Sequence, residues 1–163
     1  MPTTFTDEAT WYASLATMYG TAAALITSPS GDVLLVKPNY RELWSLPGGV
    51  LEDGEPPHVG CAREVREELG LAQPVGPLLA VAWIAPEGVR PKPVIAFLFD
   101  GGVLADASAI VLQESELDGY RFVAPSAVAG YLPPHMTARV ESGLRARNSG
   151  GAAYVPAVPA AET

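Results

Sequence analysis

Runs of apolar residues, each bounded by turn-forming residues, dominate the pattern along the chain. Runs of this length and composition predict strands of a sheet. Turn residues at 28–32 (SPSGD) and a Pro-rich connection at 85–93 separate neighbouring runs, so the first two runs form a predicted hairpin. The predicted strands are residues 21–27 (TAAALIT), 33–37, 78–84, 94–100 (VIAFLFD) and the shorter 120–123.

A different spacing marks the segment that runs from Pro57 to Gly70. Cys61, Val65 and Leu69 recur every four residues there and would share one face of a helix. Proline suits the first turn of a helix, and glycine suits its left-handed end. We therefore predict a helix between these two residues, packed on the sheet through its apolar face, with Cys61 as a packing residue.

A second helix is predicted over residues 134–147, where Met136, Val140 and Leu144 again lie four residues apart. Residues 9–18 predict a short amphipathic helix or an arm. Strands that alternate with helices in this order indicate an α/β fold in which a mixed sheet lies between helical layers.

The domain organisation follows from composition. We predict a single domain over residues 1–147, in which residues 1–20 form an N-terminal helix or arm. Residues 148–163 are rich in Ala, Pro and Gly and are predicted to form a flexible C-terminal tail. No internal repeat is evident in the sequence.

Carboxylates gather on the other face of the helix that ends at Gly70. Glu64, Glu67 and Glu68 stand at positions i, i+3 and i+4, so they face the same way. Like charges this close are costly unless a cation collects them, and a hard divalent cation with oxygen ligands is the natural collector. Arg63 lies four residues before Glu67 and can orient that carboxylate. A solvated, salt-bridged helix explains the charges but not the glycines and the glutamate that precede them.

The segment from Gly49 to Leu71 resembles the Nudix box, G-x5-E-x7-R-E-U-x-E-E-x-G-U, in which U is aliphatic. The preceding WSLPG also resembles the lead-in common in that family. The resemblance implies an α/β/α sandwich of the Nudix type and hydrolysis of a nucleoside diphosphate linked to another moiety. It also implies Mg²⁺ as cofactor, with Mn²⁺ as a substitute. Every fixed position is filled, by Gly49, Glu55, Arg63, Glu64, Val65, Glu67, Glu68, Gly70 and Leu71.

The resemblance also assigns roles to residues. The metal ligands would be Glu64, Glu67 and Glu68, joined by the backbone carbonyl of Gly48. Glu64, Glu67 and the orienting Arg63 would form the catalytic set, in which Glu64 is a candidate general base. A loop outside the box supplies the base in some Nudix enzymes. Gly49 and Glu55 would support the structure of the box.

Substrate contacts are less well defined by the sequence. Lys37, Tyr40, Arg41 and Glu116 are candidates, and Glu114 and Glu116 are also the loop carboxylates available as an alternative base. Arg90, Lys92 and Arg121 are further cations that could meet phosphate, although single basic residues are more often surface charges. His135 is expected to be a helix-start residue.

Charge and cysteine content narrow the function classes. A formal net charge of −8 argues against nonspecific nucleic-acid binding, because phosphate-backbone affinity comes from Lys and Arg. The single cysteine excludes an internal disulfide, and no Cys/His cluster suggests zinc. With no basic leader and no long apolar run, we expect a cytoplasmic enzyme with no membrane partner and a small nucleotide substrate. A homodimer stays open.

Two alternatives belong to other classes. A catalytically silent, nucleotide-sensing Nudix module would be expected to have lost box carboxylates, and this box retains all of them. An isomerase of allylic diphosphates calls for a reactive cysteine outside the helix, which the chain lacks. For the hydrolase, Val50 stands where the branch that acts on oxidised nucleoside triphosphates has lysine. Pro86 matches a proline of an ADP-ribose-hydrolysing branch.

Overall fold

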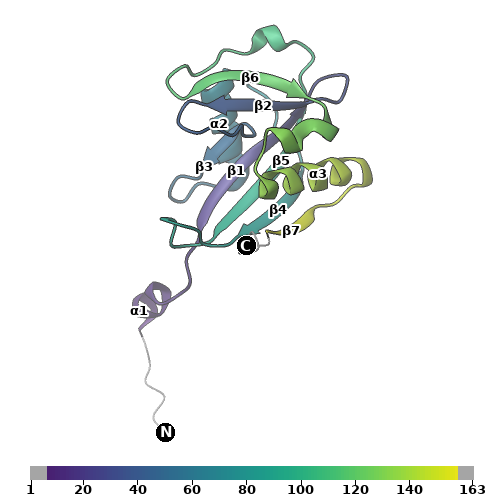
Figure 1. Ribbon diagram of the computed structural model, residues 1–163. Coiled ribbons are helices and arrows are strands. Elements are labelled where there is room, and N and C mark those ends of the chain that lie inside the picture. The colour runs from purple at the N-terminus through teal and green to yellow at the C-terminus, as the bar shows by residue number, and fades with distance from the viewer. Residues whose placement is uncertain (1–6, 158–163) are drawn as a thin grey trace.

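A seven-stranded mixed sheet forms the centre of the computed structural model, which describes residues 7–157 (Figure 1). The helices are α1 (Glu8–Ala13), α2 (Pro57–Leu69) and α3 (Pro134–Ser149), with short 3-10 segments η1 (Ala107–Ala109) and η2 (Pro125–Gly130). The strands are β1 (Tyr19–Thr27), β2 (Val33–Pro38), β3 (Gly48–Val50), β4 (Leu78–Ile84), β5 (Val94–Val103), β6 (Leu117–Val123) and β7 (Ala153–Ala157).

The strand order is β6-β2-β1-β5-β4-β7, and β3 pairs with β1 beside this row. The β1–β5 and β4–β7 pairs are parallel, whereas the other pairs are antiparallel. The predicted mixed sheet is therefore confirmed. Each of the five strands expected from the sequence is present, and several extend by up to three residues beyond the predicted ends.

The two longer helices cover opposite faces of the sheet (Figure 1). The predicted apolar face of α2, formed by Cys61, Val65 and Leu69, is buried in one core cluster. Met136 and Val140 of α3 are buried in the other cluster. Alternate residues of β1 serve the two clusters, as expected for a central strand whose side chains point to both faces. The α/β/α sandwich is confirmed.

The N-terminal element is shorter than the predicted helix or arm. Asp7 caps α1 by accepting a hydrogen bond from the backbone N–H of Thr10. None of the residues of α1 is buried, and Figure 1 shows this helix apart from the sheet. No helix within residues 7–157 is long and apolar enough to cross a membrane.

A short strand that the sequence did not predict positions the candidate site. β1 and β2 pair only through Thr27 and Val33 and then diverge, which leaves room for β3 against β1. Gly48 has a φ of +146°, and a Cβ atom there would lie 2.3 Å from the carbonyl oxygen of Ala22. Only glycine allows this approach. Strand propensity could not predict β3. Its pairing with β1 is possible because glycine has no side chain, and glycine is a poor strand former.

The C-terminal prediction is wrong where the structure describes that segment. α3 continues to Ser149, and residues 153–157 form β7, which pairs in parallel with β4. Backbone hydrogen bonds to the edge of the sheet order this Ala- and Pro-containing segment, and Val155 is buried in the core. Composition missed the strand because the unpaired edge of β4, rather than local propensity, favours it. Residues 158–163 lie outside the described residues.

Two neighbouring residues of β7 test whether this strand is docked. Val155→Asp would place a charge in the core, so we expect unfolding to become easier by about 2–4 kcal/mol. Tyr154→Asp is the matched control, because Tyr154 is 67% exposed on the same strand. Denaturant unfolding of both variants measures the difference. Equal effects of the two substitutions would show that β7 does not pack as described.

Candidate active site

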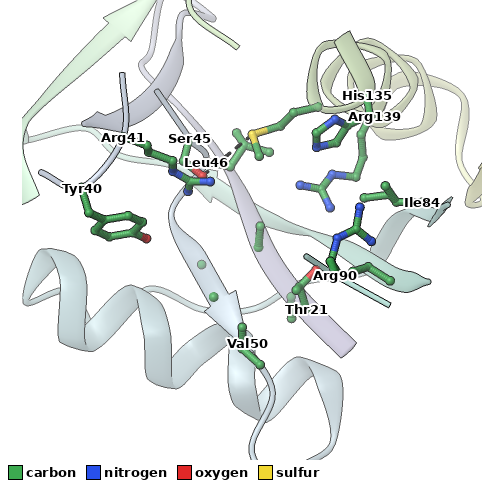
Figure 2. A pocket seen from close by; sticks show the side chains of 16 residues that line it. Thr21, Tyr40, Arg41, Ser45, Leu46, Val50, Ile84, Arg90, His135 and Arg139 are labelled. Carbon is green, nitrogen blue, oxygen red and sulfur yellow. Dashed lines mark hydrogen bonds between the residues drawn. The ribbon is translucent and has the colours of Figure 1, made fainter. Parts of the chain in front are cut away.

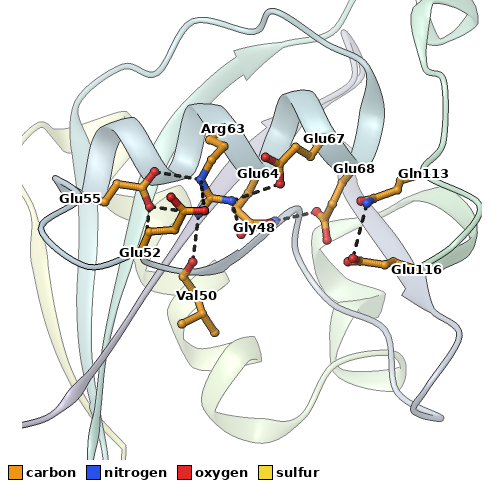
Figure 3. A network of polar contacts seen from close by, with 10 residues as sticks. All are labelled: Gly48, Val50, Glu52, Glu55, Arg63, Glu64, Glu67, Glu68, Gln113 and Glu116. Carbon is orange, nitrogen blue, oxygen red and sulfur yellow. Dashed lines mark hydrogen bonds and ion pairs between the residues drawn. The ribbon is translucent and has the colours of Figure 1, made fainter.

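Arg63 is the centre of a network of carboxylates on α2 (Figure 3). Its Nε and Nη2 donate to the two oxygens of Glu55 at 2.9 and 3.0 Å. Its Nη1 donates to Oε1 of Glu64 at 2.9 Å and to Oε2 of Glu67 at 3.1 Å. Nη2 also donates to the carbonyl of Val50 at 3.1 Å. The expected contact with Glu67 is present, and Arg63 also connects α2 with β3 and with the loop before the helix.

Glu55 is the strongest partner of Arg63. The fork of two hydrogen bonds holds the pKa of Glu55 at about 2, below its ordinary value of 4.5. A Cβ atom at Gly60 would lie 2.7 Å from Oε2 of Glu55, so the glycine makes room for the carboxylate on the helix. These contacts are those of a structural support, the role the sequence predicts for Glu55.

Glu64 lies against the backbone of β3. A Cβ atom at Gly49 would lie 2.5 Å from the carboxyl carbon of Glu64. Burial raises the pKa of Glu64 above its ordinary value, and Arg63 opposes that shift. Gly49 therefore lets a partly buried carboxylate approach the strand closely, which explains the fixed spacing between the two residues.

Glu68 is the most buried of the helix carboxylates, with only 8% of the residue exposed. Its Oε2 accepts a hydrogen bond from the backbone N–H of Gly48 at 2.8 Å. Burial raises its pKa to about 8, and the negative charges of Glu64 and Glu116 add to the shift. Within residues 7–157, no ion pair includes Glu68.

Three oxygen atoms on this face remain outside the network. Among the described residues, Oε2 of Glu64, Oε1 of Glu67 and Oε1 of Glu68 take part in no hydrogen bond or ion pair. Within the same residues, no three acidic, His or Cys side chains are grouped as a metal cage. Mg²⁺ does not require such a cage, because it binds through one or two carboxylates, water and substrate phosphate. Hard oxygen donors beside an uncompensated buried carboxylate fit a divalent cation.

One of the two loop carboxylates predicted as an alternative base, Glu116, lies close to these residues. Glu116 accepts a hydrogen bond from the side chain of Gln113 at 3.5 Å, and Figure 3 shows it facing Glu68. Its charge contributes to the raised pKa of both Glu64 and Glu68. The structure thus brings Glu116 together with the box carboxylates, although they are separated by almost fifty residues in the sequence.

A cavity of about 340 Å³ borders the carboxylate network (Figure 2). Gly48 and Gly49 line this cavity, and the same residues contact Glu68 and Glu64 on the side of α2. The volume is at the small end of the range for ligand pockets. A ligand in the cavity would therefore lie next to the acidic face, separated from it only by β3.

Two of the four predicted substrate contacts line the cavity, whereas Lys37 and Glu116 do not. Tyr40 and Arg41 are lining residues, and the guanidinium of Arg41 lies 5.5 Å from the centre of the Tyr40 ring. Lys37 instead donates to the backbone carbonyls of Pro38 and Arg41, so it braces the loop after β2.

The other basic residues that the sequence suggested as phosphate contacts also differ in whether they line the cavity. Arg90 lines the cavity. Arg121 donates to the hydroxyl of Tyr131 and lies over the ring of Trp44, outside the cavity lining. Lys92 lies near the ring of Tyr19, also outside it.

Sequence reasoning missed the part of the cavity formed by α3. His135 was expected to be only a helix-start residue, and Arg139 was not singled out, yet both line the cavity. The available signal was their spacing. Arg139 lies one turn after His135 and three residues after Met136, at the edge of the predicted apolar stripe.

Burial also decides the role of Cys61. It is fully buried in the core, and burial raises the pKa of its thiol to about 12. The prediction of a packing residue is confirmed.

Comparison with known proteins identifies the same segment. A family profile described as the NUDIX domain matches residues 18–143. This stretch contains β1 to β6, α2 and the carboxylates described above. The crystal structure of a MutT protein from Methanosarcina mazei is similar, with a TM-score of 0.69 and 30% identity, over 83% of this chain and 99% of that one.

Two curated relatives match shorter stretches. An ADP-ribose pyrophosphatase of Mycobacterium tuberculosis is 36% identical over 88 residues, which are 51% of this chain and 42% of that protein. A MutT-like protein of Streptomyces ambofaciens is 41% identical over 59 residues, 36% of this chain and 38% of that protein. The matched stretches thus span less than half of the length of either relative.

The ion pair between Arg63 and Glu55 has a defined pH signature. Because its folded-state pKa is depressed to about 2, Glu55 stabilises the fold above pH 4.5, and this contribution is lost as pH falls through 2. We expect wild type to be more stable than Glu55→Gln at neutral pH and the difference to shrink below pH 4.5. Urea unfolding over a pH series measures it, with exposed Glu141→Gln as control. A difference independent of pH would contradict this assignment.

Proposed function

The chain belongs to the NUDIX domain family, and from this premise we propose that it hydrolyses a nucleoside diphosphate linked to another moiety. The reaction would use Mg²⁺, or Mn²⁺ in its place, on the acidic face of α2. The observation that carries the proposal is the position of Glu68, a buried carboxylate with a raised pKa, one free oxygen and no ion pair within the described residues. Such a group is costly unless a cation joins it.

The proposed ligands are Glu64, Glu67 and Glu68, through the oxygens that Arg63 and Gly48 N–H leave free, with the carbonyl of Gly48 as a further donor. Bound there, the metal would neutralise diphosphate oxygens and lower the pKa of a bound water. Arg63 holds two of the ligands in orientation, and contacts of this kind commonly affect metal affinity or activity by about 10–100-fold. Gly49 and Glu55 support the network, because Gly49 leaves room for Glu64 and Glu55 holds Arg63.

Glu64 is the proposed general base. Burial raises its pKa, which makes the carboxylate a better proton acceptor, and its Oε2, outside the Arg63 network, would take the proton while Glu67 and Glu68 hold the metal. Glu116 is the second candidate, because it faces the same group of carboxylates from a loop (Figure 3). A Glu116→Gln variant with wild-type turnover would leave Glu64 as the base.

A small nucleotide derivative is the proposed substrate. Tyr40 and Arg41 stand at the cavity beside β3, where a ring could stack on Tyr40 while Arg41 meets a phosphate. The relative from Mycobacterium tuberculosis is described as an ADP-ribose pyrophosphatase, so ADP-ribose is the first compound to assay. The acidic net charge and the size of the cavity favour a small molecule over a nucleic acid.

Replacement of Glu68 tests whether this residue is a metal ligand or a structural residue. Glu68→Gln keeps the shape and the acceptor for Gly48 N–H but removes the charge, so we expect hydrolysis to fall at least about 100-fold. Because the folded-state pKa of Glu68 is raised to about 8, ionisation opposes folding. The metal-free variant should therefore be at least as stable as wild type above pH 8.

Activity assays and thermal unfolding in EDTA measure the two effects, with Glu141→Gln as a matched control that should change neither. A Glu68→Gln variant that keeps near-wild-type activity at limiting Mg²⁺ would contradict the metal assignment. A folded variant that loses stability without metal would identify Glu68 as a structural residue instead.

The source of the transferred oxygen tests the reaction itself. Residues 7–157 offer no activated Ser or Cys nucleophile, so water should attack one phosphorus of the diphosphate directly. In oxygen-18 water, single-turnover products should carry the label on one phosphate product. EDTA should stop the reaction, and Mg²⁺ should restore it. Turnover without label in the products would mean that the reaction is a group transfer and not hydrolysis. Tight binding without turnover across a panel of diphosphates would favour a nucleotide-sensing module.

A further inference from the structure

Arg139 on α3 is a buried cation that pairs with none of the residues the structure describes. Only 4% of the residue is exposed, and its Nε is buried with no hydrogen-bond partner. None of the ion pairs within residues 7–157 includes its guanidinium. Figure 2 shows this group directed into the cavity from α3. An unpaired buried charge is strongly unfavourable. We therefore expect a ligand, which is not part of the chain, to supply the group that pairs with Arg139.

The charged residues that line the cavity together with Arg139 are positive. Arg41 and Arg90 also line the cavity, and its sixteen lining residues include no aspartate or glutamate. His135, one turn before Arg139, has its pKa lowered by burial and by the charges of Arg139 and Arg90. Glu87 opposes that shift but does not line the cavity. The described residues that line the cavity therefore concentrate positive charge and include no acidic side chain.

We propose that this cavity binds an anionic group, a phosphate monoester or a carboxylate, on the part of the substrate remote from the cleaved bond, with Arg139 as its principal ligand. The substrate part of this inference rests on the proposed hydrolase function. It narrows the substrate class to diphosphates that carry a further anion. The planar guanidinium can hold either anion through two parallel hydrogen bonds.

The position of the cavity agrees with a substrate whose diphosphate lies at the acidic face and whose further anion lies near Arg139. Gly48 and Gly49 of β3 separate the cavity from Glu68 and Glu64. A diphosphate at the acidic face would therefore extend past β3 toward α3. Arg41 lies between the cavity and the acidic face, because it lines the cavity and its charge also lowers the pKa of Glu68.

An anion explains the site better than the neutral edge of a base. A base edge could accept hydrogen bonds from Arg139, as guanine does from arginine. It would leave the buried charge of Arg139 without a counter-charge from the residues that line the cavity. The volume of about 340 Å³ is at the small end of the range for ligand pockets, which agrees with a site for one part of the substrate.

Phosphate binding without metal tests the site independently of catalysis. In EDTA and at constant ionic strength, we expect millimolar inorganic phosphate to raise the Tm of wild type relative to chloride. Arg139→Met, which removes the charge but keeps an unbranched apolar chain, should abolish this rise. In chloride, its Tm should equal or exceed that of wild type, because the unpaired charge is gone. Arg145→Met, at an exposed position of the same helix, should keep the rise.

Matched substrates test which anion the site reads. UDP-glucuronate differs from UDP-glucose by a carboxylate, and the 2′-phosphate of ADP-ribose differs from ADP-ribose by a phosphate monoester. Wild type should prefer the anionic member of at least one pair in kcat/KM. Arg139→Met should reduce that preference by roughly 10-fold or more, whereas Arg145→Met should keep it.

Two results would overturn the proposal. One is a wild-type Tm that does not respond to phosphate, which decides the question even if Arg139→Met fails to fold. The other is loss of base selectivity in Arg139→Met with unchanged discrimination between the matched pairs, which would make Arg139 a reader of the base. If phosphate stabilises wild type through Arg139 but no diphosphate is hydrolysed, the anion site stands and the hydrolase function fails.

Discussion

The rest of the site depends on how charge is compensated on α2. Arg63 offers its guanidinium to Glu55, Glu64 and Glu67 and joins the helix to β3 through the carbonyl of Val50. In the described part of the chain, Glu68 stays outside this ion-pair network, is buried and accepts a hydrogen bond from one backbone N–H. Within residues 7–157, Arg63 thus pairs with three carboxylates, and no cation forms an ion pair with the buried Glu68. That difference is the physical basis of the proposed metal site beside α2.

Close backbone approach is the second requirement. Gly48 lets β3 lie against β1, Gly49 leaves room for the carboxylate of Glu64, and Gly60 leaves room for that of Glu55. Each glycine admits a contact that any side chain would block. The spacing of the sequence motif is therefore the spacing of a strand, a loop and a helix folded onto one another. The same strand forms the wall between the acidic face and the cationic cavity, so two oppositely charged sites lie on either side of it.

Local pattern was enough to predict α2, its buried face and its acidic face, because Cys61, Val65 and Leu69 alternate with the glutamates at helical spacing. It was not enough for β3 and β7, which form because neighbouring strands offer unpaired edges to segments of low strand propensity. Arg139 is a third kind of omission. Its charge becomes informative only when α3 packs on the sheet and removes the side chain from water, which a single sequence does not show.

The location of the metal is the central claim, and anomalous diffraction from crystals soaked in Mn²⁺ and a non-hydrolysable diphosphate tests it most directly. We expect a Mn²⁺ peak beside α2, within coordination distance of Glu68 and of at least one of Glu64 and Glu67. The diphosphate oxygens should complete the coordination, with the rest of the ligand directed past β3. Saturating Mn²⁺ that leaves this face empty, or that binds only to other carboxylates, would contradict the account.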